Sequence, residues 1–101
     1  MEINIQSIHF DATAKLEAFI QKKVSKLDKY SEGIRKVDVT LKVVKPETSL
    51  NKQAGLRIFV QNTDFYVEKV CDTFEEAVDL SVDTLARQLV KYKEKQQQLK
   101  K

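Results

Sequence analysis

Two segments in the middle of the chain alternate apolar and polar residues, and this pattern limits the fold more than any other feature. The apolar positions are Val37, Val39, Leu41 and Val43 in residues 35–45, and Ala54, Leu56, Ile58 and Val60 in residues 54–61. A period of two is typical of strands whose sheet has one covered face and one wet face. The polar segment 46–52 between the two segments predicts a hairpin turn.

Two further segments are predicted to extend the sheet. Residues 2–10 alternate and then change phase between Ile5 and Ile8, which indicates a strand with a bulge. Residues 65–71 form a fourth expected strand after a turn at residues 62–64. Its inward face is left open, because Val67 and Val70 could share one face only across a bulge.

Two segments have the apolar spacing of three and four that is typical of helices. Asp11 is the expected cap of a helix that runs to about residue 31, before Gly33. Asp72, followed by Glu75, is a capping-box-like start for a helix over residues 72–98. The apolar stripes are Leu16, Phe19, Ile20, Val24, Leu27 and Tyr30 in the first helix, and Phe74, Ala77, Val78, Ser81, Val82, Leu85, Leu89 and Tyr92 in the second.

The order of elements is β-α-β-β-β-α, and the expected class is α+β. The prediction is a four-stranded mixed sheet with two helices packed on one face, similar to a double-stranded-RNA-binding domain. The first two strands, if adjacent, would be parallel across the helical connection. A chain of 101 residues has room for one core. We therefore expect a single domain over residues 1–98, followed by a short basic tail over residues 99–101.

The charge is distributed unevenly along the chain. The net charge is only +3, from 15 lysines and three arginines against 15 acids. Residues 64–83 hold seven acids and one lysine, whereas residues 84–101 hold six basic residues and one acid. Such polarisation creates a local positive field, which indicates a polyanionic partner.

The basic residues of both predicted helices gather away from the apolar stripes. At about 100° per residue they form one row in each helix. The rows are Lys15, Lys22, Lys26 and Lys29 in the first helix, and Arg87, Lys91 and Lys95 in the second. Both rows could project from one surface and contact phosphates as point charges. They could equally be solvated faces of amphipathic helices, and the charges alone leave both interpretations open.

Other functional classes have little support in the sequence. His9 is the only histidine and Cys71 the only cysteine, so neither has a partner that would activate it. Two glycines are too few for a phosphate loop. We expect no enzyme activity, no cofactor and no membrane span, and hence a cytoplasmic protein.

Two weaker site hypotheses come from acidic and aromatic residues. The acids Asp72, Glu75, Glu76, Asp79 and Asp83 favour the start of a helix electrostatically rather than a metal site, so no metal is expected. Phe59, Phe65 and Tyr66 are candidates for stacking on single-stranded bases, although packing in the hairpin and core explains them as well.

The final helix carries a more specific pattern. The segments 72–79 (DTFEEAVD), 85–89 (LARQL) and 91–95 (KYKEK) resemble the ribosome hibernation promoting factor and ribosome-associated inhibitor A family. The end of the first helix, residues 22–27 (KKVSKL), resembles the same family. The resemblance extends over nearly the whole chain. The basic, glutamine-rich tail is closer to the short promoting-factor form, and the C-terminal domain of the long form is not expected.

The resemblance implies a function and a set of contacts. Members of this family bind the small ribosomal subunit at the decoding region, where they exclude transfer RNA and messenger RNA and block translation under stress. A second hibernation factor is a further candidate partner. The contacts to ribosomal RNA carried over from the helices are Lys22, Lys23, Lys26, Lys29, Arg87, Lys91, Lys93 and Lys95. Thr84 and Val90 stand where the family usually has basic residues.

Two alternatives of other classes stay open from the sequence. One is a generic module that binds structured RNA, since such modules share the layout of sheet and helices. The other is a protein-interaction domain whose charges only keep it soluble. Competition with transfer RNA on the small subunit, and sedimentation with ribosomes at low salt, would separate these functions.

Overall fold

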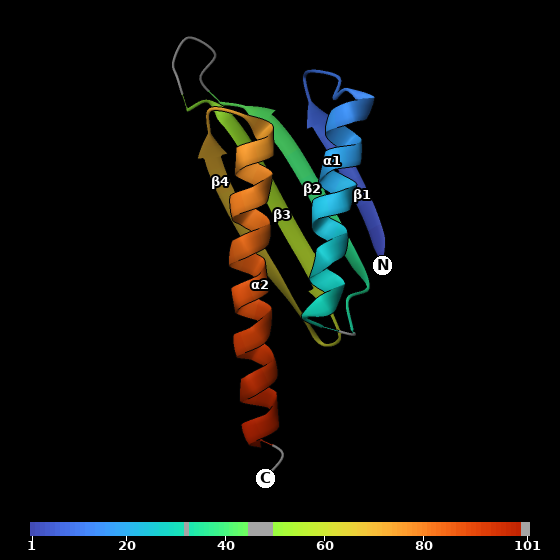
Figure 1. Ribbon diagram of the computed structural model, residues 1–101, viewed down its shortest axis with the longest axis vertical. Helices are drawn as coiled ribbons and strands as arrows, with labels where there is room; N and C mark the ends of the chain where they lie inside the picture. Colours follow the sequence, from blue (N-terminus) through green and yellow to red (C-terminus); the bar gives the residue numbers. More distant parts are fainter. Residues whose placement is uncertain (32, 45–49, 100–101) are drawn as a thin grey trace.

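A computed structural model describes residues 1–31, 33–44 and 50–99, and the side chains up to Lys95 (Figure 1). The two helices are α1 and α2, and a short 3-10 turn, η1, continues α1. The elements in chain order are β1 (Glu2–Ile8), α1 (Ala14–Ser25), η1 (Lys26–Lys29), β2 (Lys36–Val43), β3 (Lys52–Val60), β4 (Thr63–Cys71) and α2 (Phe74–Leu99). In the described residues, neither helix combines the length and the apolar character needed to cross a membrane.

The four strands form one mixed sheet in the order β1-β2-β3-β4. β1 lies parallel to β2, with Ile5 beside Val39, and the other neighbours are antiparallel. Figure 1 shows α1 and α2 side by side on one face of the sheet, running in the same direction. The predicted fold class and the parallel first pair are therefore confirmed.

The core lies between the sheet and the two helices. Its members are the alternating apolar residues of the strands and most residues of the apolar stripes of the helices, as the periodicities predict. The largest fully buried side chains are Ile20, Leu27, Leu41, Leu56, Ile58, Leu85 and Leu89. Their burial removes apolar surface from water, and this is the main source of stability in a small domain.

The outer strands differ from their prediction. β1 ends at Ile8 and pairs with β2 without a bulge, because His9 adopts a positive φ of 66° and turns the chain. Phe10 then stacks on Phe74 of α2, with ring centroids 5.0 Å apart. In β4, Val67 is buried and Val70 is exposed, so the strand needs no bulge either.

The hairpin turns are shorter than expected where the structure describes them. β3 begins at Lys52, so the predicted turn at 46–52 loses its last residue, and residues 45–49 lie outside the described part. Between β3 and β4 only Gln61 and Asn62 form the turn. Asn62 has a φ of 72°, the left-handed conformation that tight hairpin turns require and that asparagine tolerates well.

Both helix caps lie later in the chain than predicted. Thr13, not Asp11, caps α1, and its hydroxyl accepts a hydrogen bond from the Leu16 amide at 3.1 Å. Thr73, not Asp72, caps α2 by the same contact to the Glu76 amide. The Asp72 carboxylate instead accepts a bond from the Leu50 amide at 2.8 Å, so it ties the β2–β3 connection to the start of α2. At α2, a tertiary contact thus occupies Asp72 and leaves the adjacent Thr73 as the cap.

Candidate nucleic-acid interface

One ion pair connects the two helices across the gap between them. The Lys23 ammonium lies 3.1 Å from the Asp79 carboxylate of α2, and it also lies 5.6 Å from the centre of the Phe19 ring. Lys23 is therefore half-buried between the helices. This ion pair joins the end of α1 to the first turns of α2.

Three of the four candidate contacts on α1 and η1 are exposed. Lys22 and Lys26 lie on the outward side of the helix, because the buried positions Ile20, Val24 and Leu27 face the sheet. Lys29 is exposed at the end of η1, where the helix has tightened to 3-10 geometry. The charges nearest the end of this helix therefore face solvent, as predicted.

The candidate contacts on α2 divide between two sides of the helix. Arg87, Lys91 and Lys95 are exposed and follow one another at intervals of four residues, which places them in one row. Lys93 is about 200° from Lys91 around the helix. It lines a hollow of about 280 Å³ together with Lys29 of η1. The structure therefore brings Lys93 to the other helix and leaves the row on the outward side.

All acids of α2 except Glu94 lie in its first half, and the last of them, Asp83, contacts the basic row. Asp79 pairs with Lys23, as described above, and Asp83 lies 3.4 Å from the Arg87 guanidinium one turn later. Both groups of this second pair are largely exposed, so the interaction is weak and easily exchanged for another anion. The acidic and basic halves meet at Asp83 and Arg87.

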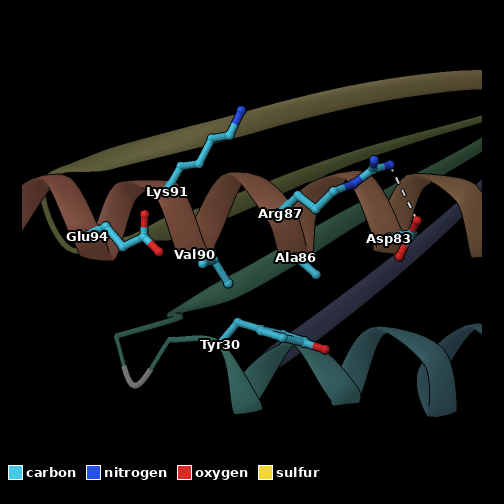
Figure 2. Close-up of a pocket in the computed structure, with 7 residues that line it drawn as sticks. All are labelled: Tyr30, Asp83, Ala86, Arg87, Val90, Lys91 and Glu94. Atoms are coloured by element: carbon cyan, nitrogen blue, oxygen red, sulfur yellow. Dashed lines mark hydrogen bonds and ion pairs between the residues drawn. The ribbon is translucent and has the colours of Figure 1, made fainter.

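A hollow of about 400 Å³ lies between the end of η1 and the second half of α2 (Figure 2). Figure 2 shows Tyr30 lying between the helices, with Ala86 and Val90 pointing toward it and Lys91 pointing away. Tyr30 is 37% exposed and Val90 is 40% exposed. The interpretation of Tyr30 as the last residue of the apolar stripe is therefore wrong. It lies near the end of the sheet, where the helices leave a gap.

The sequence contained one signal for this hollow that the prediction missed. Val90 lies well off the apolar stripe of α2, between Leu89, which belongs to the stripe, and Lys91, which belongs to the basic row. An apolar residue in that position has no core to enter. It indicates a contact outside the core, and only the packing of the two helices shows that Tyr30 lies opposite.

The aromatic residues proposed for base stacking lie in different places. Phe65 packs edge to face against Tyr92 of α2, on the covered side of the sheet. Phe59 and Tyr66 lie on the open face, beneath the cationic groups of Lys36 and Arg57 respectively. Burial raises the pKa of the Tyr66 hydroxyl, and the hydrogen bond it donates to Glu68 raises it further. None of the three lies beside the basic rows of α1, η1 and α2.

Cys71 and His9, whose side chains are of the types that can act in catalysis, lie apart from the basic rows of the helices. Cys71 is buried at the end of β4, and burial raises the pKa of its thiol, as do the neighbouring carboxylates of Glu76 and Asp72. A raised pKa disfavours the reactive thiolate. His9 is exposed in the turn after β1, so the prediction that it lies in the strand is wrong.

Two solved structures share this architecture. A ribosomal subunit interface protein from Coxiella burnetii aligns with a TM-score of 0.81 and 20% identity, over 92% of this chain and 98% of the other. The N-terminal domain of Protein Y from Thermus thermophilus aligns with a TM-score of 0.78 and 21% identity, over 91% of this chain and 99% of the other. At these identities the likeness establishes the class of fold.

The sequence comparisons establish the family. Residues 3–97 match the family described as Sigma 54 modulation protein / S30EA ribosomal protein, and the chain belongs to it. The ribosome hibernation promoting factor of Azotobacter vinelandii is 30% identical over 95% of this chain and 86% of its own length. That of Escherichia coli is 31% identical over 97% of this chain and 99% of its own length. The resemblance found in the final helix is therefore confirmed.

Proposed function

We propose that this protein is a ribosome hibernation factor that binds the small ribosomal subunit at the decoding region and blocks translation. It acts in the cytoplasm through the single domain over residues 1–98. The observation that carries the proposal is that α1, η1 and α2 carry exposed basic residues toward their C-terminal ends. The two helices run in the same direction along the sheet, so these ends lie on the same side of the molecule (Figure 1). The family membership and the names of the relatives support the choice of the ribosome as the partner.

The proposed mechanism is steric exclusion combined with neutralisation of phosphates. Five exposed basic side chains contact the backbone of ribosomal RNA in this proposal: Lys22, Lys26, Arg87, Lys91 and Lys95. Lys29 and Lys93 approach it at the far end of the two helices. Lysine suits this task because it contacts phosphate as a point charge and reads no base sequence. No bond is made or broken, and the protein inhibits by occupying the path of messenger RNA and transfer RNA.

Lys23 has a second role in this proposal. Its ammonium is already paired with Asp79, so its contact with RNA requires that it leave or share that carboxylate. We therefore assign Lys23 chiefly to the positioning of α1 against α2. The other seven candidates carry most of the contact with phosphate.

Competition on purified small subunits tests the proposed function. We expect saturation near one protein per subunit, and displacement of the protein when an initiation complex with messenger RNA and initiator transfer RNA is assembled. Each neutralised phosphate releases counterions, with a slope of log affinity against log salt of about −0.9 per phosphate for duplex DNA. Five to seven contacts predict a slope of roughly −4 to −6.

Full occupancy of one subunit by both this protein and transfer RNA in the peptidyl site would disprove exclusion. Binding of many copies per subunit, with no displacement by transfer RNA, would favour a nonspecific cation. A protein-interaction domain predicts no sedimentation with ribosomes even at low salt. Each of these outcomes is visible in the same sedimentation series.

A further inference from the structure

The hollow between the helices differs from an ordinary solvated surface. Two of the exposed large apolar side chains of the described chain, Tyr30 and Val90, line it together. Tyr30 comes from the end of η1 and Val90 from α2, so the two helices supply one wall each (Figure 2). An apolar slot of this kind is not needed for phosphate contacts, which require only charge.

Cationic groups surround this apolar slot. Arg87 and Lys91 line the rim of the 400 Å³ hollow, and Lys29 and Lys93 line the adjoining hollow, which also includes Tyr30 and Val90. The arrangement therefore combines an aromatic ring with positive charge on both sides. Proteins that hold single-stranded nucleic acid use this combination, because the ring stacks on a base while the cations contact the backbone.

We infer that this hollow holds one unpaired nucleobase of the bound RNA, stacked on Tyr30, with the adjacent phosphates on Lys91 and Lys29. This inference rests on the proposed function and adds a contact that the basic rows do not supply. The two carboxylates of the hollow are consistent with it. Asp83 is paired with Arg87, and Glu94 lines both hollows, where it can accept hydrogen bonds from the amino group of a base.

Substitutions of Tyr30 separate a base from other occupants. Tyr30→Leu keeps an apolar side chain but removes the aromatic face, whereas Tyr30→Phe keeps the face. Removal of an aromatic stacking partner costs about 1–3 kcal/mol per base, which corresponds to a loss of affinity of roughly 5- to 150-fold. For small subunits, and for a short single-stranded RNA of mixed sequence, we expect this loss in Tyr30→Leu and near wild-type binding in Tyr30→Phe.

Three controls make the result specific. The salt slope should be the same in Tyr30→Leu and in the wild type, because no phosphate contact is removed. Inorganic polyphosphate, which has charge but no bases, should bind both proteins equally. Tyr66→Leu, on the open face of the sheet, should leave RNA binding unchanged. Thermal melting confirms that each variant is folded.

The outcomes distinguish failure of this inference from failure of the proposed function. Wild-type affinity in a folded Tyr30→Leu variant would overturn the inference, because any apolar side chain would then suffice, as it would for a protein segment in the hollow. The proposed function would stand if the wild type still bound one copy per subunit. Absence of wild-type binding to the subunit would instead overturn the proposed function.

Discussion

The two halves of α2 differ in what lies beneath them and in the charge they carry. The first half packs on the sheet through Val78, Leu85 and other buried side chains, and its exposed positions are mainly acidic. The second half carries Arg87, Lys91 and Lys95, and Figure 1 shows its last turns extending beyond the sheet. Beyond Leu89, only Tyr92 among the side chains described there packs against the core.

This difference teaches how one helix can serve both stability and binding. The size and apolar character of the side chains over the sheet are constrained by packing, because a smaller side chain leaves a cavity in the core. Side chains beyond the sheet have no core to fill, so their charge is free to meet a partner. The acids at the start of α2 also interact favourably with its N-terminal dipole. The comparison predicts that substitutions in one half change stability and those in the other change binding.

The largest expected effect is on binding. Lys22, Lys26, Arg87 and Lys91 are all exposed, so their joint replacement by Ala should leave the protein folded. A hydrogen bond to a charged group contributes about 1.5–3 kcal/mol, and four lost contacts should weaken binding to the small subunit by roughly 10,000-fold or more. Sedimentation and thermal melting of the same samples measure both quantities.

The matched control removes four lysines from the strands. This control variant has Ala in place of Lys36, Lys42, Lys52 and Lys69. Its net charge equals that of the variant that lacks Lys22, Lys26, Arg87 and Lys91. We expect this protein to retain most of its affinity. Equal losses in the two variants would mean that total charge, and not the helical surface, determines binding.

The next effect in size is on stability. Leu85 is fully buried in the first half of α2, and Leu85→Ala should lower the free energy of unfolding by about 2–5 kcal/mol. Leu41→Ala in β2 should cost a similar amount. Val90→Ala, in the second half, should change stability by only about 0.5 kcal/mol. Urea denaturation followed by circular dichroism measures all three, and comparable losses at Leu85 and Val90 would contradict the division of α2.

The smallest effect concerns the ion pair between the helices. A double-mutant cycle with Lys23→Met and Asp79→Asn should give a coupling energy of about 0.2–1 kcal/mol, because Asp79 is largely exposed. The coupling should decrease as salt is raised. Methionine preserves the packing of the side chain on Phe19, so the cycle isolates the charge. A coupling of zero would mean that packing alone sets the positions of the helices.

The sequence predicted the secondary structure well wherever periodicity was long and regular. The alternation in β2 and β3 and the apolar stripe of α2 extend over many residues. A single residue that departs from such a pattern therefore does not change the predicted element. The ends of elements were less predictable. Asp72 and Thr73 are both good caps, and the choice between them depended on a bond from Leu50, which is distant in sequence.

The candidate site was predicted in part. The exposure of Lys22, Lys26, Arg87 and Lys91 followed from helical angles alone, since each lies away from the apolar stripe of its own helix. The pairing of Lys23 with Asp79 did not follow, because it requires the distance between two helices. Contact with ribosomal RNA stays a prediction for all of these residues.

By itself, the sequence determined the order of the elements, the faces of the strands and helices, and the family to which the chain belongs. These properties depend on residues that are close along the chain or on patterns shared with relatives. Only the tertiary structure decided that Tyr30 and Val90 form one hollow, and that Lys93 joins Lys29 and not Lys91. The physical reason is that the gap between two helices is set by their packing on a common sheet, which no single segment encodes.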